Sequence, residues 1–151
     1  MSIYGSYLTE GVIEESANLV PSKIEDEGGN QEEFKDNIKI LKANWSTVIN
    51  KVAEDTKNYI DSCLSETLKY IETHPDKGKN YQKYIDLCKK YDTIDKVKKS
   101  IKFFSGRYTG DGWFALVFDH PVPDKDGHSI FMDDCKIING KVKCGHCTFE
   151  G

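Results

Sequence analysis

The chain has 151 residues, a net charge of −4 and five cysteines. This length is typical of a single domain with its own core, and no apolar run is long enough to span a bilayer, so an integral membrane protein is excluded. The cysteines are odd in number and scattered, and the first residues lack the basic and apolar stretches of a secretory signal. We therefore expect one cytoplasmic domain over residues 1–151 and no disulfide framework.

Charge is distributed unevenly along the chain. Residues 1–37 carry nine acids and two lysines, a net charge of −7, and residues 38–102 carry fourteen lysines and nine acids, a net charge of +5. The acidic segment suggests a docking surface for a basic partner. On the charges alone, the better interpretation is a solvated leader balanced by a lysine-rich helical surface.

The first 29 residues form an acidic leader that we expect to be partly flexible. Short apolar groups at 7–9 and 11–13 are consistent with a strand or hairpin, and residues 24–29 are typical of an acidic loop.

A long helical stripe follows the leader. Asn30 is a favourable N-cap, and Glu33 stands at the capping-box position three residues later. Apolar residues then recur at steps of three and four, namely Phe34, Ile38, Leu41, Trp45, Val48, Ile49 and Val52. One helix over 31–73 would be about 64 Å long at 1.5 Å per residue. We therefore expect a bend or break near residues 54–58, and Pro75 ends the element.

The rest of the chain predicts a second helix and then a sheet. The helix covers roughly 80–91, with one further turn after it, and the strands cover about 100–108, 113–119, 128–137 and 141–149. This order predicts an α+β fold in which two or three amphipathic helices pack on a C-terminal antiparallel β-meander.

The last two strands form a hairpin whose register can be predicted. Asn139-Gly140 is the preferred two-residue type I′ turn, and it places Cys135 opposite Cys144. One face then collects Cys135, Ile137, Val142 and Cys144, and the other collects Lys136, Lys141 and Lys143. Slipping the strands by one residue would bury the lysines, so this sorting supports the register.

The cysteines near this hairpin suggest two kinds of site. Cys144-Gly145-His146-Cys147 resembles a disulfide-isomerase motif, but that chemistry needs a following helix, so we reject it. The alternative is a zinc site whose ligands are Cys135, Cys144, Cys147 and one histidine, which is His146, His120 or His128. In a regular strand Cys144 and Cys147 point to opposite faces, and free cysteines are commonly buried, so we expect no cofactor. A Cys135–Cys144 disulfide fits the geometry but not a reducing compartment.

Other motifs do not predict catalysis or nucleic-acid binding. Asp124-Lys125-Asp126-Gly127 resembles the start of a calcium loop, but the closing position holds Cys135 instead of Glu. His128 has no identifiable nucleophile or orienting acid beside it. The lysine-rich helices lack the arginines that base readout and phosphate clamps favour, since Arg107 is the one arginine. We therefore expect a protein that is not an enzyme and does not bind nucleic acid.

A weak family resemblance begins at about residue 34. It is carried by a mid-helix Asn44-to-Ile49 segment, by Asp111-Gly112 before an aromatic strand, and by Gly127-His128-Ser129-Ile130. These features resemble bacterial domain-of-unknown-function family 2262. The resemblance implies a non-catalytic α+β domain, and small acidic domains of this kind are common among bacterial immunity proteins, by analogy.

The favoured hypothesis is a protein-binding module, most concretely an immunity-type inhibitor that blocks a basic toxin domain by steering and steric occlusion. Its partner-binding residues would be Glu25, Asp26, Glu27, Glu32, Glu33, Asp124 and Asp126. One alternative is a zinc-stabilised or metal-dependent protein that uses the cysteine cluster. Another is a self-associating scaffold, and the sequence does not give the oligomeric state.

Overall fold

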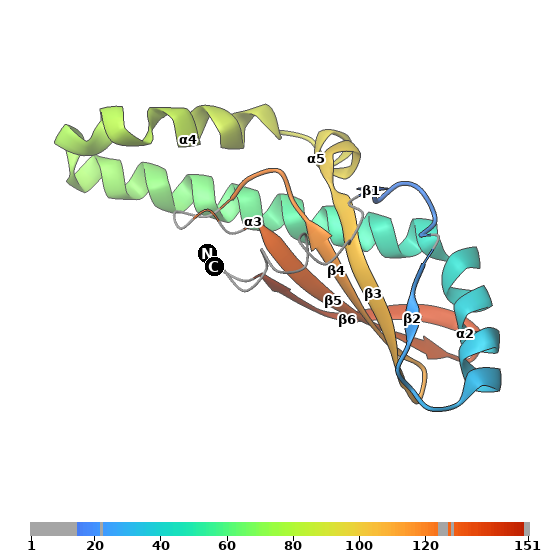
Figure 1. Cartoon of the computed structure of the whole chain (residues 1–151). Helices are drawn as coiled ribbons and strands as arrows, with labels where there is room; N and C mark the ends of the chain where they lie inside the picture. Colours follow the sequence, from blue (N-terminus) through green and yellow to red (C-terminus); the bar gives the residue numbers. More distant parts are fainter. Residues whose placement is uncertain (1–14, 22, 124–126, 128, 150–151) are drawn as a thin grey trace.

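The computed structural model describes residues 15–21, 23–123, 127 and 129–149, with only the backbone described for Glu15 and residues 145–149. Its helices are α2 (Gln31–Ala43), α3 (Trp45–Thr73), η1 (Pro75–Lys77), α4 (Gly78–Lys90) and α5 (Ile94–Ser100). Its strands are β1 (Glu15–Ser16), β2 (Glu25–Asp26), β3 (Lys102–Gly110), β4 (Trp113–Asp119), β5 (Ile130–Ile138) and β6 (Lys141–Phe149). All four α-helices precede the four long strands, which confirms the α+β class (Figure 1).

The sheet has the strand order β1-β3-β4-β5-β6, and β2 also pairs with β3. The four long strands form the predicted antiparallel meander, whereas β2 runs parallel to β3, with Glu25 opposite Arg107 and Asp26 opposite Tyr108. The prediction of a loop over 24–29 was therefore wrong for residues 25 and 26. Their backbone is held by pairing with a strand about 80 residues away, which local composition does not reveal.

The terminal hairpin has the predicted register. Cys135 lies opposite Cys144 and Ile138 opposite Lys141, and the turn residues Asn139 and Gly140 have φ values of 51° and 74°. Positive φ at both positions is the conformation of a type I′ turn. Beyond Cys135 the register shifts, so that Asp134 pairs with His146. The extra residue in β6 is a β-bulge at Gly145.

The long helical stripe is interrupted at Asn44, so the predicted break near 54–58 was wrong. Asn44 has φ −110° and ψ 18°, and its side-chain Nδ2 donates to the carbonyl of Ile40 at 2.8 Å. Asn44 thus ends α2 and allows α3 to start in a new direction. The 29 residues of α3 then run without a break for about 43 Å.

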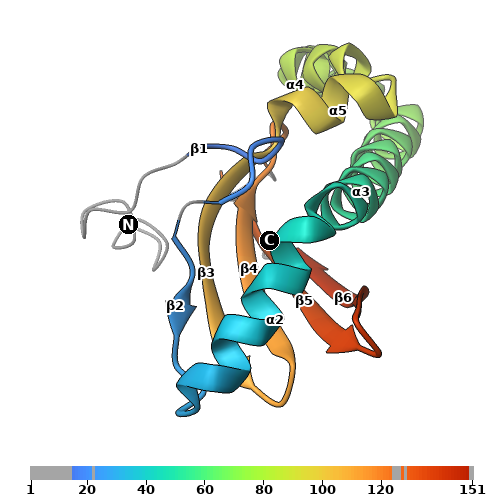
Figure 2. The ribbon, with the colours of Figure 1, turned by 90° about the vertical axis from the view of Figure 1, so that its right-hand side faces the viewer.

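The length of α3 is accommodated because its second half extends beyond the sheet. Figure 1 shows this half running beside α4 as a helical hairpin, and Figure 2 shows α2 lying across the strands. Ile60 of α3 and Cys88 of α4 are buried in the core, and Leu64 and Tyr84 pack against the same core. Thus α4 covers α3, and α2 and the first half of α3 cover the sheet.

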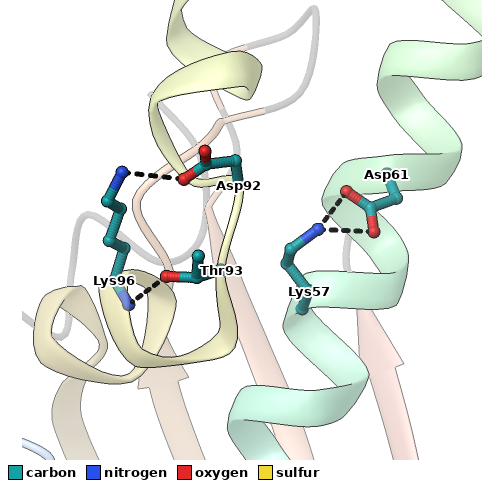
Figure 3. Close-up of polar contacts among 5 residues, drawn as sticks. All are labelled: Lys57, Asp61, Asp92, Thr93 and Lys96. Carbon is teal, nitrogen blue, oxygen red and sulfur yellow. Dashed lines mark hydrogen bonds and ion pairs between the residues drawn. The ribbon is translucent and has the colours of Figure 1, made fainter.

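The short helix α5 is fixed by local contacts at its start (Figure 3). The Thr93 hydroxyl accepts a hydrogen bond from the backbone N–H of Lys96 at 3.2 Å, which is an N-cap, and the Lys96 ammonium reaches Asp92 at 2.8 Å. The neighbouring helix α3 carries a similar pair, in which Lys57 contacts Asp61 at 2.6 Å. The Thr93 cap defines where α5 begins, and the exposed pair between Lys96 and Asp92 adds little stability.

Tyr108 of β3 joins α2 to the β3–β4 turn. Its side chain is fully buried, and its hydroxyl donates to the Glu33 carboxylate and accepts from the Asn37 amide and the Gly112 backbone N–H, both at 2.8 Å. The same Glu33 oxygen accepts from the Asp111 N–H at 2.9 Å. We call this group the Tyr108 network, and it satisfies donors at a turn and at a helix start together.

We predict that Tyr108→Phe lowers the free energy of unfolding by about 1–3 kcal/mol, because the buried Gly112 N–H and the Asn37 amide lose their acceptor. Urea unfolding monitored by tryptophan fluorescence would measure the change. Tyr70→Phe is the matched control, since Tyr70 is 40% exposed, and it should stay within about 0.5 kcal/mol of the parent. An equal loss in both variants would contradict the role assigned to the Tyr108 hydroxyl.

Candidate functional site

The predicted acidic surface is formed by β2, the turn after it and the first turn of α2. Glu25, Asp26, Glu27 and Glu32 are exposed on these segments. The backbone of β2 is fixed by its pairing with β3, and the N–H of Glu27 donates to the Tyr108 carbonyl at 2.8 Å. We call these four residues the acidic edge.

Glu33 belongs to the fold and is not part of that surface. It is half-buried, and its carboxylate accepts from Tyr108 and Asp111 in the Tyr108 network. Asp26 also makes a local hydrogen bond, in which its Oδ1 accepts from the Gly28 N–H at 3.0 Å, but its side chain remains exposed. Asp124 and Asp126 lie outside the described residues.

The ion pairs at the acidic edge are long and exposed. Glu25 lies 4.0 Å from Lys23, Glu27 lies 3.7 Å from Arg107, and Glu32 lies 3.6 Å from Lys35. The three glutamate side chains are 49–84% exposed. Exposed pairs of this kind contribute about 0–1 kcal/mol. The nearby lysine and arginine side chains therefore neutralise these carboxylates only weakly, and the negative charges remain accessible to a cationic partner.

A second group of chemically interesting side chains is buried beneath α3. The ligand atoms of Asp133, Cys135 and Cys144 all lie within 4.8 Å of one another, and the two sulfur atoms are 3.2 Å apart. Asp133 and Cys135 alternate on β5 and are buried, and Cys144 faces Cys135 from β6 and is half-buried. We call these three residues the thiol–carboxylate cluster.

Asp133 is an unusual residue for the inner face of a sheet. It is 1% exposed, its Oδ1 lies 4.0 Å from the Cys135 sulfur, and its Oδ2 has no hydrogen-bond partner among the described residues. Burial, helped by the negative charges of Asp55 and Asp134, raises its pKa to about 7. Lys51 partly opposes this effect, but the Lys51 ammonium is bound to Asp55 at 2.9 Å. The carboxylate is thus desolvated without a dedicated cation in the described part of the chain.

The two thiols have the character of core residues and not of nucleophiles. Hydrogen bonding with Cys144, together with burial, holds the pKa of the Cys135 thiol well above its ordinary value. Reactive cysteines instead have a lowered pKa and an electropositive environment. The raised pKa of Cys135 therefore argues against a nucleophilic role for this thiol.

The structure brings together only part of the predicted zinc set. Cys135 and Cys144 are adjacent as expected, whereas the side chains of His146, Cys147 and His128 lie outside the described residues. His120 is elsewhere in the core, where its ring packs on Tyr59 and Phe131. Asp133 was missed by the sequence analysis. The signal was its position two residues before Cys135, which places both on the buried face of one strand.

A polar pocket of about 440 Å³ opens beside β4, and it does not assemble a catalytic pair. It is lined in part by Asp119, His120 and Ser129. The Ser129 hydroxyl donates to the Asp119 carboxylate, and the contact between His120 and Ser129 is a backbone hydrogen bond of 3.0 Å. A serine activated by a histidine base would require a side-chain contact between those two residues. Among the described residues, the side chain that Ser129 contacts in this pocket is therefore Asp119.

The raised pKa of Asp133 predicts a specific pH dependence in protein treated with a chelator. Because the folded state holds the proton more tightly than the unfolded chain, this group stabilises the fold fully below about pH 4, and the stabilisation is lost as pH rises through about 7. Asp133→Asn removes that dependence. Between pH 4 and pH 8 the parent should lose roughly 3–4 kcal/mol of unfolding free energy from this group, and the variant should not show this loss. A constant difference across that range, measured by urea unfolding, would contradict the assignment.

Comparison of the chain with models of protein families, with curated proteins and with solved structures finds no match in any of the three. Among the described residues, no helix combines the length and the apolar character needed to cross a bilayer. The interpretation of the site therefore rests on the residues themselves.

Proposed function

We propose that the protein is a non-catalytic binding module, an immunity-type inhibitor that binds and blocks a basic toxin domain through the acidic edge. The observation that carries this proposal is the set of four exposed carboxylates on a backbone that β3 and the Tyr108 network hold in place. The inhibitory role is proposed by analogy with small acidic immunity proteins.

The position of the acidic edge suits recognition by charge. β2 lies at the margin of the sheet, where it pairs with β3 alone among the described strands, so a partner can approach its other side. Pairing on one side and the hydrogen bond from Glu27 order this segment before binding, which lowers the entropy that a partner must overcome. Carboxylates that are loosely paired steer a cationic surface and raise the association rate more than they raise the affinity itself.

The inhibitor role can be tested with the products of neighbouring genes as candidate partners. Each product is expressed alone and with this chain, and cell growth and the activity of the purified product are measured. We expect one basic product to arrest growth and to lose activity in a stoichiometric complex with this chain. If no basic product is bound and inhibited, the proposed function is wrong.

The role of the acidic edge predicts an effect on association kinetics. Glu25→Lys, Asp26→Lys and Glu27→Lys together should slow association with the basic partner at least tenfold at low salt, and high salt should shrink the difference. Stopped-flow or surface-based kinetics at two ionic strengths would measure this. The matched control reverses Glu66, Glu72 and Asp76, which are exposed at the far end of α3 and in η1, so that the net charge changes equally.

The control variant should associate at a rate close to that of the parent. Equal rates for the parent and the acidic-edge variant at low salt would exclude this surface as the binding site. A variant that merely becomes less soluble, with unchanged kinetics, would assign the charges to protection of an exposed strand edge instead.

A further inference from the structure

The thiol–carboxylate cluster contains the donor atoms of a metal site, and this inference is independent of the proposed function. In the described part of the chain it is the one group of three or more histidine, cysteine or acidic side chains close enough together to hold an ion. We propose that Asp133, Cys135 and Cys144 bind one divalent ion of the zinc class, which links β5 to β6 beneath α3.

The spacing of the three ligand atoms fits such an ion. Zinc binds cysteine sulfur at about 2.3 Å and carboxylate oxygen at about 2.0–2.2 Å, so two ligands of a tetrahedral ion lie about 3.5–3.8 Å apart. The Cys135 sulfur lies 3.2 Å from the Cys144 sulfur and 4.0 Å from the Asp133 oxygen. The ligand atoms of Asp133 and Cys144 lie within 4.8 Å of each other. Side-chain adjustments of up to about 1 Å would therefore complete the three bonds, and a fourth coordination position would remain.

The environment of Asp133 supplies an independent reason for a cation. A carboxylate that is 1% exposed and leaves one oxygen without a hydrogen-bond partner is destabilising unless a positive charge compensates it. The nearest candidate on α3, Lys51, is bound to Asp55. An ion held by Asp133 and two thiolates would satisfy the orphan oxygen and the buried charge at once.

The ligand types select the class of ion. Two sulfur ligands favour zinc and other soft or borderline ions over magnesium and calcium, which prefer oxygen ligands alone. The half-buried side chain of Cys144 gives the cluster contact with solvent, through which an ion can enter.

The chain offers a matched control in its second pair of cysteines. Cys63 on α3 is half-buried and Cys88 on α4 is buried, like Cys144 and Cys135, and both lie at the Tyr84 hydroxyl. The described residues place no histidine or carboxylate within ligand distance of this pair. The two pairs thus match in burial, although one lies on helices and the other on strands, and they differ in the presence of Asp133.

The test is a titration of the full reduced chain with Zn²⁺ alone, by calorimetry and by competition with a chromophoric chelator. We expect one ion per chain, a rise in the thermal unfolding temperature on zinc addition, and cobalt absorption bands typical of thiolate ligation when Co²⁺ replaces zinc. Asp133→Asn and Cys144→Ser should each weaken zinc binding by more than about 100-fold, since loss of a residue that only hydrogen-bonds to a metal ligand already costs about 10–100-fold. Cys63→Ser and Cys88→Ser should leave the affinity unchanged.

Circular dichroism shows whether each variant is folded, and the titration of the parent chain tests the proposal even if one variant fails to fold. Absence of stoichiometric zinc binding to the parent would overturn the proposal, as would unchanged binding in folded Cys144→Ser or Asp133→Asn. A Cys135–Cys144 disulfide in freshly purified chain, detected by mass spectrometry after alkylation of free thiols, would also overturn it. None of these results depends on whether a basic toxin domain is bound.

Discussion

The interaction on which the arrangement depends is the hydrogen bond between Tyr108 and Glu33. It joins the first turn of α2 to the β3–β4 turn, two segments that are 75 residues apart in the sequence. Asp111 and Gly112 donate to the same two side chains, so one buried hydroxyl and one carboxylate satisfy a helix start and a hairpin turn together. This contact ties α2 to the sheet, whereas the backbone pairing of β2 with β3 holds β2 along the margin.

The acidic run is consequently divided between fold and surface. Glu33 is withdrawn into the Tyr108 network, and the residues of the acidic edge remain exposed on a backbone that the same network orders. Asp133 presents the opposite case, because it is an acid on the buried face of β5 whose charge the described residues do not balance. Glu33 is therefore part of a buried hydrogen-bond network, the four residues of the acidic edge are exposed, and Asp133 requires a cation or a proton to balance its charge.

The parts of the fold that sequence reasoning predicted are those with local causes. The Asn139-Gly140 turn dictates the register of β5 and β6, and alternation along each strand separates lysines from core residues. The pairing of β2 with β3 was missed because a tertiary contact decides it. The break was predicted at 54–58 because the apolar stripe continues through Asn44, where a local contact of the Asn44 side chain with the Ile40 carbonyl ends α2. A single helix over 31–73 appeared too long for the domain, and the sequence does not show that the second half of α3 extends beyond the sheet beside α4.

The candidate sites divide in the same way. The cysteine pair followed from the hairpin register, and Asp133 could have been added from its alternation with Cys135. By contrast, Glu33 looks like any other member of an acidic run, since only the position of Tyr108 in space shows that it is internal. Composition alone does not distinguish acidic side chains in buried hydrogen-bond networks from acidic side chains that are exposed on the surface.

The most direct test of this division compares two adjacent residues of α2. Glu32→Ala and Glu33→Ala each remove one negative charge from the first helical turn, so both lose the same favourable interaction with the helix dipole. The free energies of unfolding of the two variants should differ, with Glu33→Ala losing about 1–3 kcal/mol more than Glu32→Ala because the Tyr108 hydroxyl and the Asp111 N–H lose their acceptor. Equal losses in urea unfolding would show that Glu33 belongs to the surface, and the account of how α2 and the acidic edge are positioned would be wrong.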